Sequence, residues 1–211
     1  MHSIFIAAAG NTRALTQMIW LPGAYHHARH FLDAGFAQGV ARRRMHMDLR
    51  FVDLEMQHLE DRQALRRLRS EFVLPAFESG ASVWLGGISL GGMAALDYAS
   101  CYLGELDGLC LLAPYLGNRM LIDEIAAQGL HAWEPGELAE ADTERRIWRF
   151  IKTGAGARPL FLGFGSDDRF AAAHRLLATA LPAERVKVAD GAHDWRTWTG
   201  LWEDFLDLRV T

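Results

Sequence analysis

The sequence GGISLGG, residues 86–92, separates two segments of different character. Before it, residues 81–85 form a short apolar run of the kind found in buried strands. After it, residues 93–98 are rich in small side chains that suit a closely packed helix. The glycines between the two segments predict a sharp strand-to-helix turn with Ser89 at its centre. An ordinary glycine-rich structural turn is the alternative interpretation.

The positions of the glycines indicate what this turn could do. Gly87 and Gly91 lie two residues either side of Ser89 and carry no Cβ, so that strand and helix can approach each other closely. The serine hydroxyl would then project from the turn. The amide that follows it, that of Leu90, would point outward from a helix N-terminus, where negative charge is stabilised. The stretch therefore predicts a nucleophilic serine beside an amide that can stabilise an oxyanion.

This G-x-S-x-G stretch, with an apolar strand before it and a helix after it, resembles the nucleophile elbow of α/β-hydrolases. The resemblance implies an α/β fold with a mostly parallel central sheet and helices on both faces. It also implies a serine hydrolase in which an acid and a base follow the serine, each in a loop after a later strand.

The order of elements along the chain agrees with that fold. Alternating strands and helices with continuously apolar strands predict a parallel sheet covered on both faces. Strands are expected at 3–8, 15–21, 47–54, 81–85, 109–113, 159–164 and 185–188, and helices at 28–43 (interrupted near 35–39), 60–78, 93–102, 118–130, 137–153, 170–180 and 195–208. Pro75 should end or kink its helix. We expect one domain over 1–211, with 115–157 forming a small helical cap or pocket wall within it.

Composition limits the classes of partner. A chain of 211 residues with a formal charge of −4 suits one α/β domain and gives no general attraction to nucleic acid or an anionic membrane. The apolar run at 4–9 is too short for a signal peptide and no stretch could span a bilayer, so a cytoplasmic protein is expected. Cys101 and Cys110 are interpreted as small buried residues without a disulfide.

The resemblance also assigns the base and the acid. The loop after 185–188 resembles the G-x-H-D loop of the family, with His193 as the base. The loop after 159–164 resembles the G-x-x-D turn, with Asp168 as the acid. If that loop is shifted by one residue, Asp167 is the acid and Asp168 caps the next helix. Asp194 follows the base directly and is interpreted as a cap for the last helix.

An oxyanion hole needs a second donor besides the amide of Leu90. The loop after the early strand, residues 22–25, resembles the H-G-x loop of the family, with Pro22 in place of the histidine. The donor there is a backbone amide, so the substitution does not remove it. Ala24 is the first choice and Tyr25 the second, and an ordinary strand-to-helix turn is the alternative.

Two clusters could carry other chemistry. His26 and His30 would share a helix face with His27 beside them, yet no H-E-x-x-H pattern follows. We expect no metal and no cofactor, and interpret these histidines as exposed or as lining the mouth of the site. The arginines at 42–44 and at 66, 67 and 69 are interpreted as solvated faces with buried stems. The alternative is that they hold an acidic or phosphate-bearing substrate, such as a coenzyme A thioester. Trp133, Trp148, Tyr115 and Leu116 are expected in the core or in an acyl pocket.

The sequence thus predicts a carboxylic-ester hydrolase that acts on a small-molecule acyl ester by a Ser-His-Asp triad and an acyl-enzyme. An acyl thioesterase or acyltransferase on the same triad is the second hypothesis. An acid-amide or peptide hydrolase would differ only in the shape of its pocket and in the protonation of the leaving group. A protein that binds a small ligand on this fold without turnover is the hypothesis of another class.

Overall fold

The computed structural model describes residues 1–10, 14–54, 62–139, 142–154 and 157–210. In this part of the chain, seven strands form one sheet in the order β1-β3-β2-β4-β5-β6-β7. Only β1 is antiparallel to its neighbour. The mostly parallel sheet is therefore confirmed. The strands are β1 (Ser3–Ile6), β2 (Thr16–Leu21), β3 (Met47–Val52), β4 (Ser82–Ile88), β5 (Gly108–Leu112), β6 (Leu160–Gly165) and β7 (Val186–Ala189).

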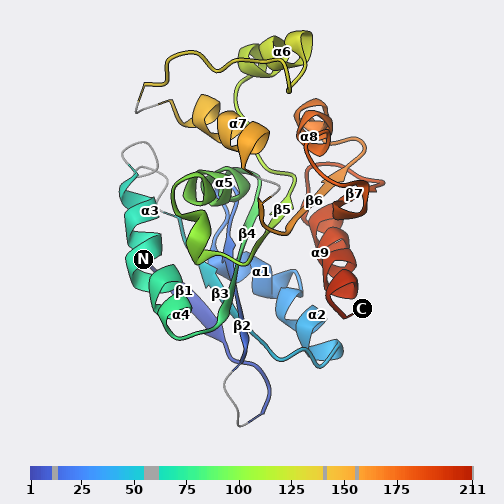
Figure 1. Ribbon diagram of the computed structural model, residues 1–211. Helices are drawn as coiled ribbons and strands as arrows, with labels where there is room; N and C mark the ends of the chain where they lie inside the picture. Colours follow the sequence, from blue (N-terminus) through green and yellow to red (C-terminus); the bar gives the residue numbers. More distant parts are fainter. Residues whose placement is uncertain (11–13, 55–61, 140–141, 155–156, 211) are drawn as a thin grey trace.

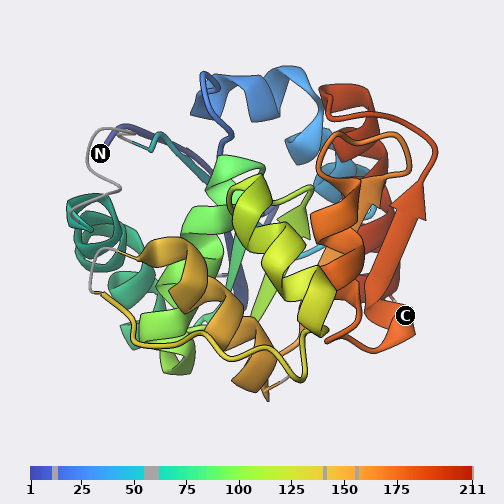
Figure 2. The ribbon, with the colours of Figure 1, turned by 90° about the horizontal axis from the view of Figure 1, so that it is seen from above.

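Helices cover both faces of the sheet, as expected (Figures 1 and 2). On one face lie α1 (Ala28–Asp33), α2 (Phe36–Arg42) and α9 (Trp195–Val210). On the other lie α3 (Gln63–Leu68), α4 (Leu74–Glu78) and α5 (Leu90–Tyr102). Between β5 and β6 the chain forms α6 (Arg119–Gln128) and α7 (Thr143–Thr153), and α8 (Ala171–Ala178) follows β6. Both α6 and α7 lie above the end of the sheet at which β4 leads into α5 (Figure 1).

An aromatic cluster fixes α1, α2 and α9 to the sheet. Trp20 of β2 makes edge contacts with Phe36 of α2 and Trp202 of α9, at ring-centroid distances of 5.0 and 5.1 Å. The indole of Trp202 donates a hydrogen bond to the carbonyl of Phe36, so its polar atom is satisfied in the core (3.0 Å). These three fully buried rings hold the first and last parts of the chain on the same face of the sheet.

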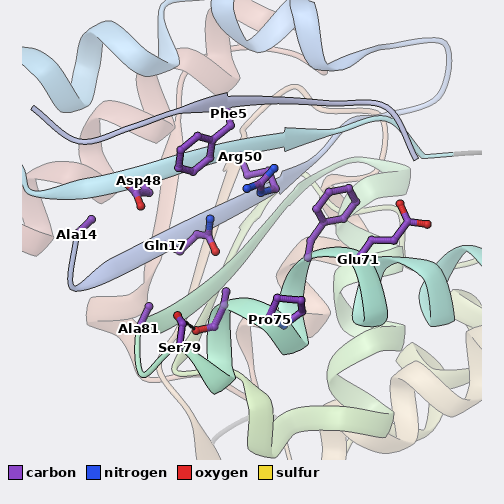
Figure 3. Close-up of a pocket in the computed structure, with 11 residues that line it drawn as sticks. Phe5, Ala14, Gln17, Asp48, Arg50, Glu71, Pro75, Ser79 and Ala81 are labelled. Carbon is purple, nitrogen blue, oxygen red and sulfur yellow. Dashed lines mark hydrogen bonds between the residues drawn. The ribbon is translucent and has the colours of Figure 1, made fainter.

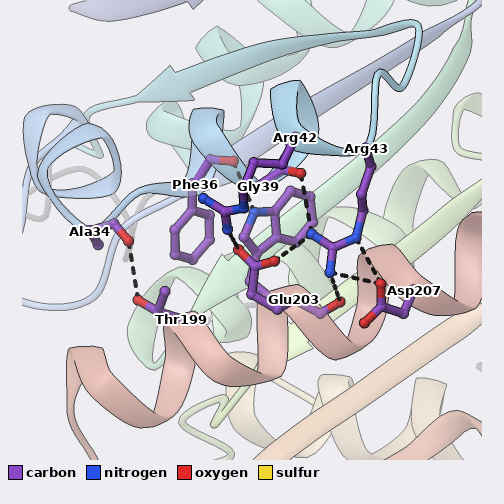
Figure 4. Close-up of polar contacts among 9 residues, drawn as sticks. Ala34, Phe36, Gly39, Arg42, Arg43, Thr199, Glu203 and Asp207 are labelled. Atoms are coloured by element: carbon purple, nitrogen blue, oxygen red, sulfur yellow. Dashed lines mark hydrogen bonds and ion pairs between the residues drawn. The ribbon is translucent and has the colours of Figure 1, made fainter.

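The arginines at 42 and 43 form part of this helix contact and are not simply a solvated face (Figure 4). Arg42 pairs with Glu203 at 2.6 Å, and Arg43 pairs with both Glu203 and Asp207 of α9. The Arg43 side chain is only 18% exposed, and its pKa is raised, chiefly by the hydrogen bond with Glu203. The expectation that the guanidinium of Arg43 is solvated was therefore wrong, because it pairs with Glu203 of α9, which lies 160 residues away in sequence.

Several boundaries differ from the predictions. The helix expected over 28–43 breaks at Gly35, which has a left-handed φ of 86°, and the helix expected from 137 begins at Thr143 with Asp142 as its N-cap. The start of the helix expected at 60 lies outside the described residues. Pro75 does not end that helix, because the chain widens into a π-turn over Arg69–Val73. In such a turn a carbonyl accepts a hydrogen bond from the amide five residues later in the sequence. Cys110 is buried as expected, whereas Cys101 is exposed.

Candidate active site

Ser89 occupies the turn between β4 and α5 in a backbone conformation that is rare for a residue with a side chain. Its φ is 51° and its ψ is −115°. The amide of Ser89 donates to the carbonyl of Leu112 at the end of β5, and its carbonyl accepts from the amide of Tyr115 (3.1 and 2.8 Å). The loop after β5 therefore holds the serine backbone on both sides, so that its unusual conformation is maintained.

The glycines around Ser89 are required by close backbone contacts. A Cβ on Gly87 would lie 2.2 Å from the carbonyl oxygen of Gly91, and one on Gly91 would lie 2.1 Å from the carbonyl oxygen of Leu21. Backbone cannot move away as the end of a flexible side chain can, so any larger residue would push β2, β4 and α5 apart. The sharp turn predicted from the sequence is present, and its glycines have the predicted function.

The structure brings Ser89, His193 and Asp168 together in a chain of hydrogen bonds. The Nδ1 atom of His193 lies 2.7 Å from Oδ2 of Asp168, and its Nε2 atom lies 3.0 Å from Oγ of Ser89. With the Nδ1 proton donated to the carboxylate, Nε2 is left as an acceptor for the serine hydroxyl. Asp167 is exposed and Asp168 is buried, and Asp168 is the carboxylate that contacts His193.

The environment of Asp168 favours its ionised form. Burial raises the pKa of this carboxyl, but hydrogen bonds from His193 and from the amide of Phe170 act in the opposite direction, and the net effect lowers the pKa. The contact with the Phe170 amide, at 2.8 Å, fixes the second carboxylate oxygen. Asp168 therefore contacts His193 and also accepts from the backbone just before α8. Asp194 accepts from the amide of Thr197 at 2.9 Å, which agrees with its interpretation as a helix cap.

The loops that carry Asp168 and His193 are joined to each other by backbone hydrogen bonds. The amide of Asp167 donates to the carbonyl of Gly191, and the amide of Ser166 donates to that of Ala189 (2.9 and 2.8 Å). A Cβ on Gly165 would lie 2.2 Å from the carbonyl oxygen of Gly191, so the two loops are in backbone contact. This contact fixes the distance between the carboxylate and the imidazole.

Possible oxyanion donors lie beside Ser89. A Cβ on Gly23 would come within 3.3 Å of the Cβ of Ser89, so the loop after β2 reaches the turn. Within the described residues, the amides of Leu90, Ala24 and Tyr25 donate no hydrogen bond to a protein group. All three remain candidates for an oxyanion hole. Tyr25 also has a left-handed φ of 62° and is 95% exposed.

Sequence reasoning did not identify His174, a fully buried histidine of α8. Its Nε2 atom contacts the carbonyl of Pro114 at 2.9 Å, so the imidazole joins α8 to the loop that holds Ser89. Burial lowers the pKa of His174 to about 4, so that it is neutral at pH 7 and Nε2 can donate. Its position between Ala171 and Leu177 on the apolar face of the helix was the available signal.

The histidines of the early loop lie close to the base. The ring of His26 contacts the rings of His30 and Trp195, at 5.4 and 5.3 Å. The pKa of His26 is lowered, mainly by burial and next by the charges of His30 and His193.

No group of three or more potential metal ligands occurs in the part of the chain that the structure describes. In the same part of the chain, no helix is long and apolar enough to cross a bilayer.

A cavity of about 500 Å³ lies between the loop after β5, the start of α6 and the start of α8. Tyr115 and Leu116 line it, whereas Trp133 and Trp148 are fully buried in the core.

A second cavity, of about 250 Å³, is lined by Arg50 and Gln17 among others (Figure 3). It lies near the amino ends of β2, β3 and β4, at the edge of the sheet opposite Ser89, so it takes no part in the site described here.

Comparison with solved structures places this arrangement among known folds. The s-formylglutathione hydrolase (FrmB) from Staphylococcus aureus matches with a TM-score of 0.63 and 14% identity, over 96% of this chain and 84% of that chain. Est1E from Butyrivibrio proteoclasticus matches with a TM-score of 0.65 and 15% identity, over 99% of this chain and 93% of that chain. The monoacylglycerol lipase from Paleococcus ferrophilus matches with a TM-score of 0.64 and 13% identity, over 99% of this chain and 97% of that chain.

The chain has the α/β-hydrolase fold. No family model matches the sequence, and no match to a curated protein was found. At identities of 13–15% these comparisons establish the architecture, and the chemistry has to be argued from the site itself. Ser89 lies in the turn between β4 and α5, at the carboxyl end of a central strand, which is the position at which the α/β-hydrolase fold can carry a nucleophile.

The acid can be tested with a pair of neighbouring aspartates. If Asp168, His193 and Ser89 act together in ester hydrolysis, Asp168→Asn should lower its rate by about 10⁴-fold, because an amide no longer holds His193 in the tautomer that accepts the serine proton. Asp167→Asn is the matched control and should stay within about twofold of the wild type, since Asp167 is exposed. Steady-state kinetics on purified variants measures both. Equal losses in the two variants would contradict the assignment of Asp168.

The buried His174 predicts how stability depends on pH. In the unfolded chain it titrates near 6.5, and in the folded chain its pKa is about 4, so between these values the unfolded state binds a proton that the folded state does not. The free energy of unfolding should therefore fall by about 2–3 kcal/mol as the pH drops from 7 towards 4.

Urea unfolding of the wild type and His174→Gln across this range measures the effect. The variant keeps a donor for the Pro114 carbonyl, and its stability should depend less on pH. The exposed His131→Gln serves as the control and should follow the wild type. Parallel pH profiles for wild type and His174→Gln would show that His174 does not titrate as described.

Proposed function

We propose that this chain is a serine hydrolase that cleaves a carboxylic ester through an acyl-enzyme. The observation that carries the proposal is the unbroken chain of hydrogen bonds from Asp168 through His193 to Ser89, at 2.7 and 3.0 Å. A serine hydroxyl alone is a weak nucleophile at neutral pH, and an oriented imidazole is the group that activates it. The similar structures, among them a monoacylglycerol lipase, agree with this class of reaction.

In the proposed reaction, His193 takes the proton of Ser89 as Oγ attacks the ester carbonyl. The amides of Leu90 and of Ala24, or of Tyr25 as the second choice, stabilise the resulting oxyanion. Collapse of this intermediate breaks the bond to the alcohol, which leaves with the proton from His193. Water then attacks the acyl-serine, giving a proton to His193 that returns to Ser89 as the carboxylic acid departs. Asp168 stabilises the imidazolium at both steps.

We further propose that residues 115–157 form one wall of the substrate site. Tyr115, Leu116 and the first turn of α6 line the cavity beside the elbow. The helix α7 supports this wall from behind, since Trp148 donates to the carbonyl of Leu116 at 2.7 Å and Arg146 pairs with the buried Asp97 of α5 at 2.8 Å. These contacts suit a fixed pocket wall better than a mobile lid.

Thioester hydrolysis on the same triad is the second candidate. It is favoured by the similarity to s-formylglutathione hydrolases, whose name gives an S-acyl compound as the substrate. Both reactions use the same nucleophile and the same oxyanion donors. They differ in the leaving group, because a thiolate departs with less need of a proton from His193. Matched oxygen and sulfur esters with the same acyl group would separate the two.

Hydrolysis of p-nitrophenyl esters from acetate to laurate tests the proposal. The wild type should turn over at least part of the series, and the chain-length profile should reflect the size of the pocket. Ser89→Ala and His193→Ala should each lose about 10³-fold or more, because each removes an element of a cooperative unit. Circular dichroism should show that both variants are folded.

If the folded wild type is inactive across the oxygen esters and a matched thioester series, the hydrolase proposal fails. A ligand-binding protein on a hydrolase fold would then be the better account. If activity is present and survives Ser89→Ala, the assignment of the nucleophile fails even though the chain is an enzyme.

A further inference from the structure

The cavity between α6 and α8 shares its walls with the candidate triad. Phe170, which lines the cavity, makes an edge contact with the ring of His193 at a centroid distance of 5.2 Å. Tyr115, on the facing loop, contacts Phe170 at 5.5 Å and donates its amide to the carbonyl of Ser89. A molecule in this cavity would therefore lie against residues that touch both the nucleophile and the base. At about 500 Å³, the cavity has the size of a small-molecule site.

The lining of this cavity combines apolar side chains with two cations. Ile122 of α6 and Ala172 and Ala173 of α8 supply an apolar surface. Arg119, at the start of α6, and Arg169, just before α8, add a guanidinium from each side. An apolar site of this kind, with few polar groups, orients its ligand by those groups. The two arginines are therefore the features that would select among esters.

Within the described ranges of the chain, the carboxylates near the cavity form no ion pair with Arg169. Asp123 is the carboxylate of the lining, and it pairs with Arg119 at 3.4 Å. Glu144 accepts from the amide and side chain of Asn118 and from the hydroxyl of Tyr115, so it is occupied in the loop. Among the described residues, no carboxylate lies within ion-pair distance of Arg169.

The guanidinium of Arg169 and the ring of His193 contact the same aromatic side chain, that of Phe170. The guanidinium lies over the ring of Phe170, 4.7 Å from the centroid, and the same ring contacts His193. A planar guanidinium presents paired N–H donors that match a carboxylate. A negative group bound by Arg169 would thus lie beside a ring that also contacts His193, within the span of a small ester whose carbonyl is at Ser89.

We propose that the preferred substrates are small esters that carry a carboxylate, recognised by Arg169 with Arg119 as a second cation at the rim. This inference rests on the proposed ester hydrolysis and adds the chemical class of the substrate. The apolar surface of α6 and α8 would contact the carbon chain or ring that joins the carboxylate to the ester. Arg169 is then a specificity-determining residue that takes no part in bond breaking.

Pairs of esters that differ only in charge test the proposal. The monoethyl ester of glutaric acid is compared with the corresponding carboxamide, which places the charge on the acyl side. Para-acetoxybenzoate is compared with para-acetoxybenzamide, which places it on the alcohol side. Proton release in a pH-stat, corrected for spontaneous hydrolysis, gives kcat/KM for each ester. The wild type should prefer the carboxylate in at least one pair by about fivefold or more, the size expected of one exposed ion pair.

Three variants identify the origin of the preference. Arg169→Gln should abolish it by lowering kcat/KM for the carboxylate ester much more than kcat/KM for its neutral partner. Arg169→Lys should keep part of it, because the charge remains and the paired donors do not. Arg149→Gln removes an exposed arginine of α7 outside the cavity lining, and it should leave the preference intact.

The outcomes separate this inference from the proposed function. Hydrolysis of the neutral esters that depends on Ser89, without a preference for charge in either pair, would overturn the role of Arg169 and leave the hydrolase intact. A preference that Arg149→Gln removes as strongly as Arg169→Gln would show a general field of the surface and would also overturn it. Absence of hydrolysis for every ester, charged and neutral, would count against the proposed function itself.

Discussion

The contact of backbone with backbone at the turn between β4 and α5 is the constraint on which the site depends. Gly91 lies so close to the carbonyl of Leu21, and Gly87 so close to that of Gly91, that no side chain fits at either position. The turn is consequently tight enough to give Ser89 a φ of 51°. That conformation is unfavourable for a single residue, and the hydrogen bonds from β5 and its loop offset part of the cost. The serine is thereby held before any substrate binds.

Parallel pairing of the strands assembles the remaining groups around this turn. Because β4, β5, β6 and β7 run in the same direction, the loops at their carboxyl ends all meet at one edge of the sheet. His193 reaches Ser89 across 104 residues of sequence in this way. The acid loop and the base loop are joined by their own backbone hydrogen bonds, and His174 joins α8 to the loop beside Ser89. Loops that would be mobile alone are thus bound to one another.

The chain shows which features sequence reasoning can predict. The type and order of the elements follow from apolar periodicity and from glycine, which are local, and the turn at Ser89 follows from two glycines whose function is steric. The resemblance to α/β-hydrolases implied that Ser89, His193 and Asp168 would meet, and the structure brings the three side chains together. What could not be anticipated depends on partners distant in sequence: the pairing of Arg43 with α9, the burial of His174, the exposure of Cys101 and the passage of a helix through Pro75. The choice between Asp167 and Asp168 likewise depended on how the loop after β6 folds against the loop that carries His193.

The central claim is that Ser89 is the activated nucleophile, and covalent trapping tests it most directly. The folded protein is treated with a fluorophosphonate, digested, and the modified peptide identified by mass spectrometry. The account predicts a single adduct on Ser89 in the folded protein. No adduct should form when the protein is denatured before labelling or when His193 is replaced in His193→Ala, because the hydroxyl reacts only when the imidazole takes its proton. Labelling of a different residue, or none in the folded wild type, would contradict the account.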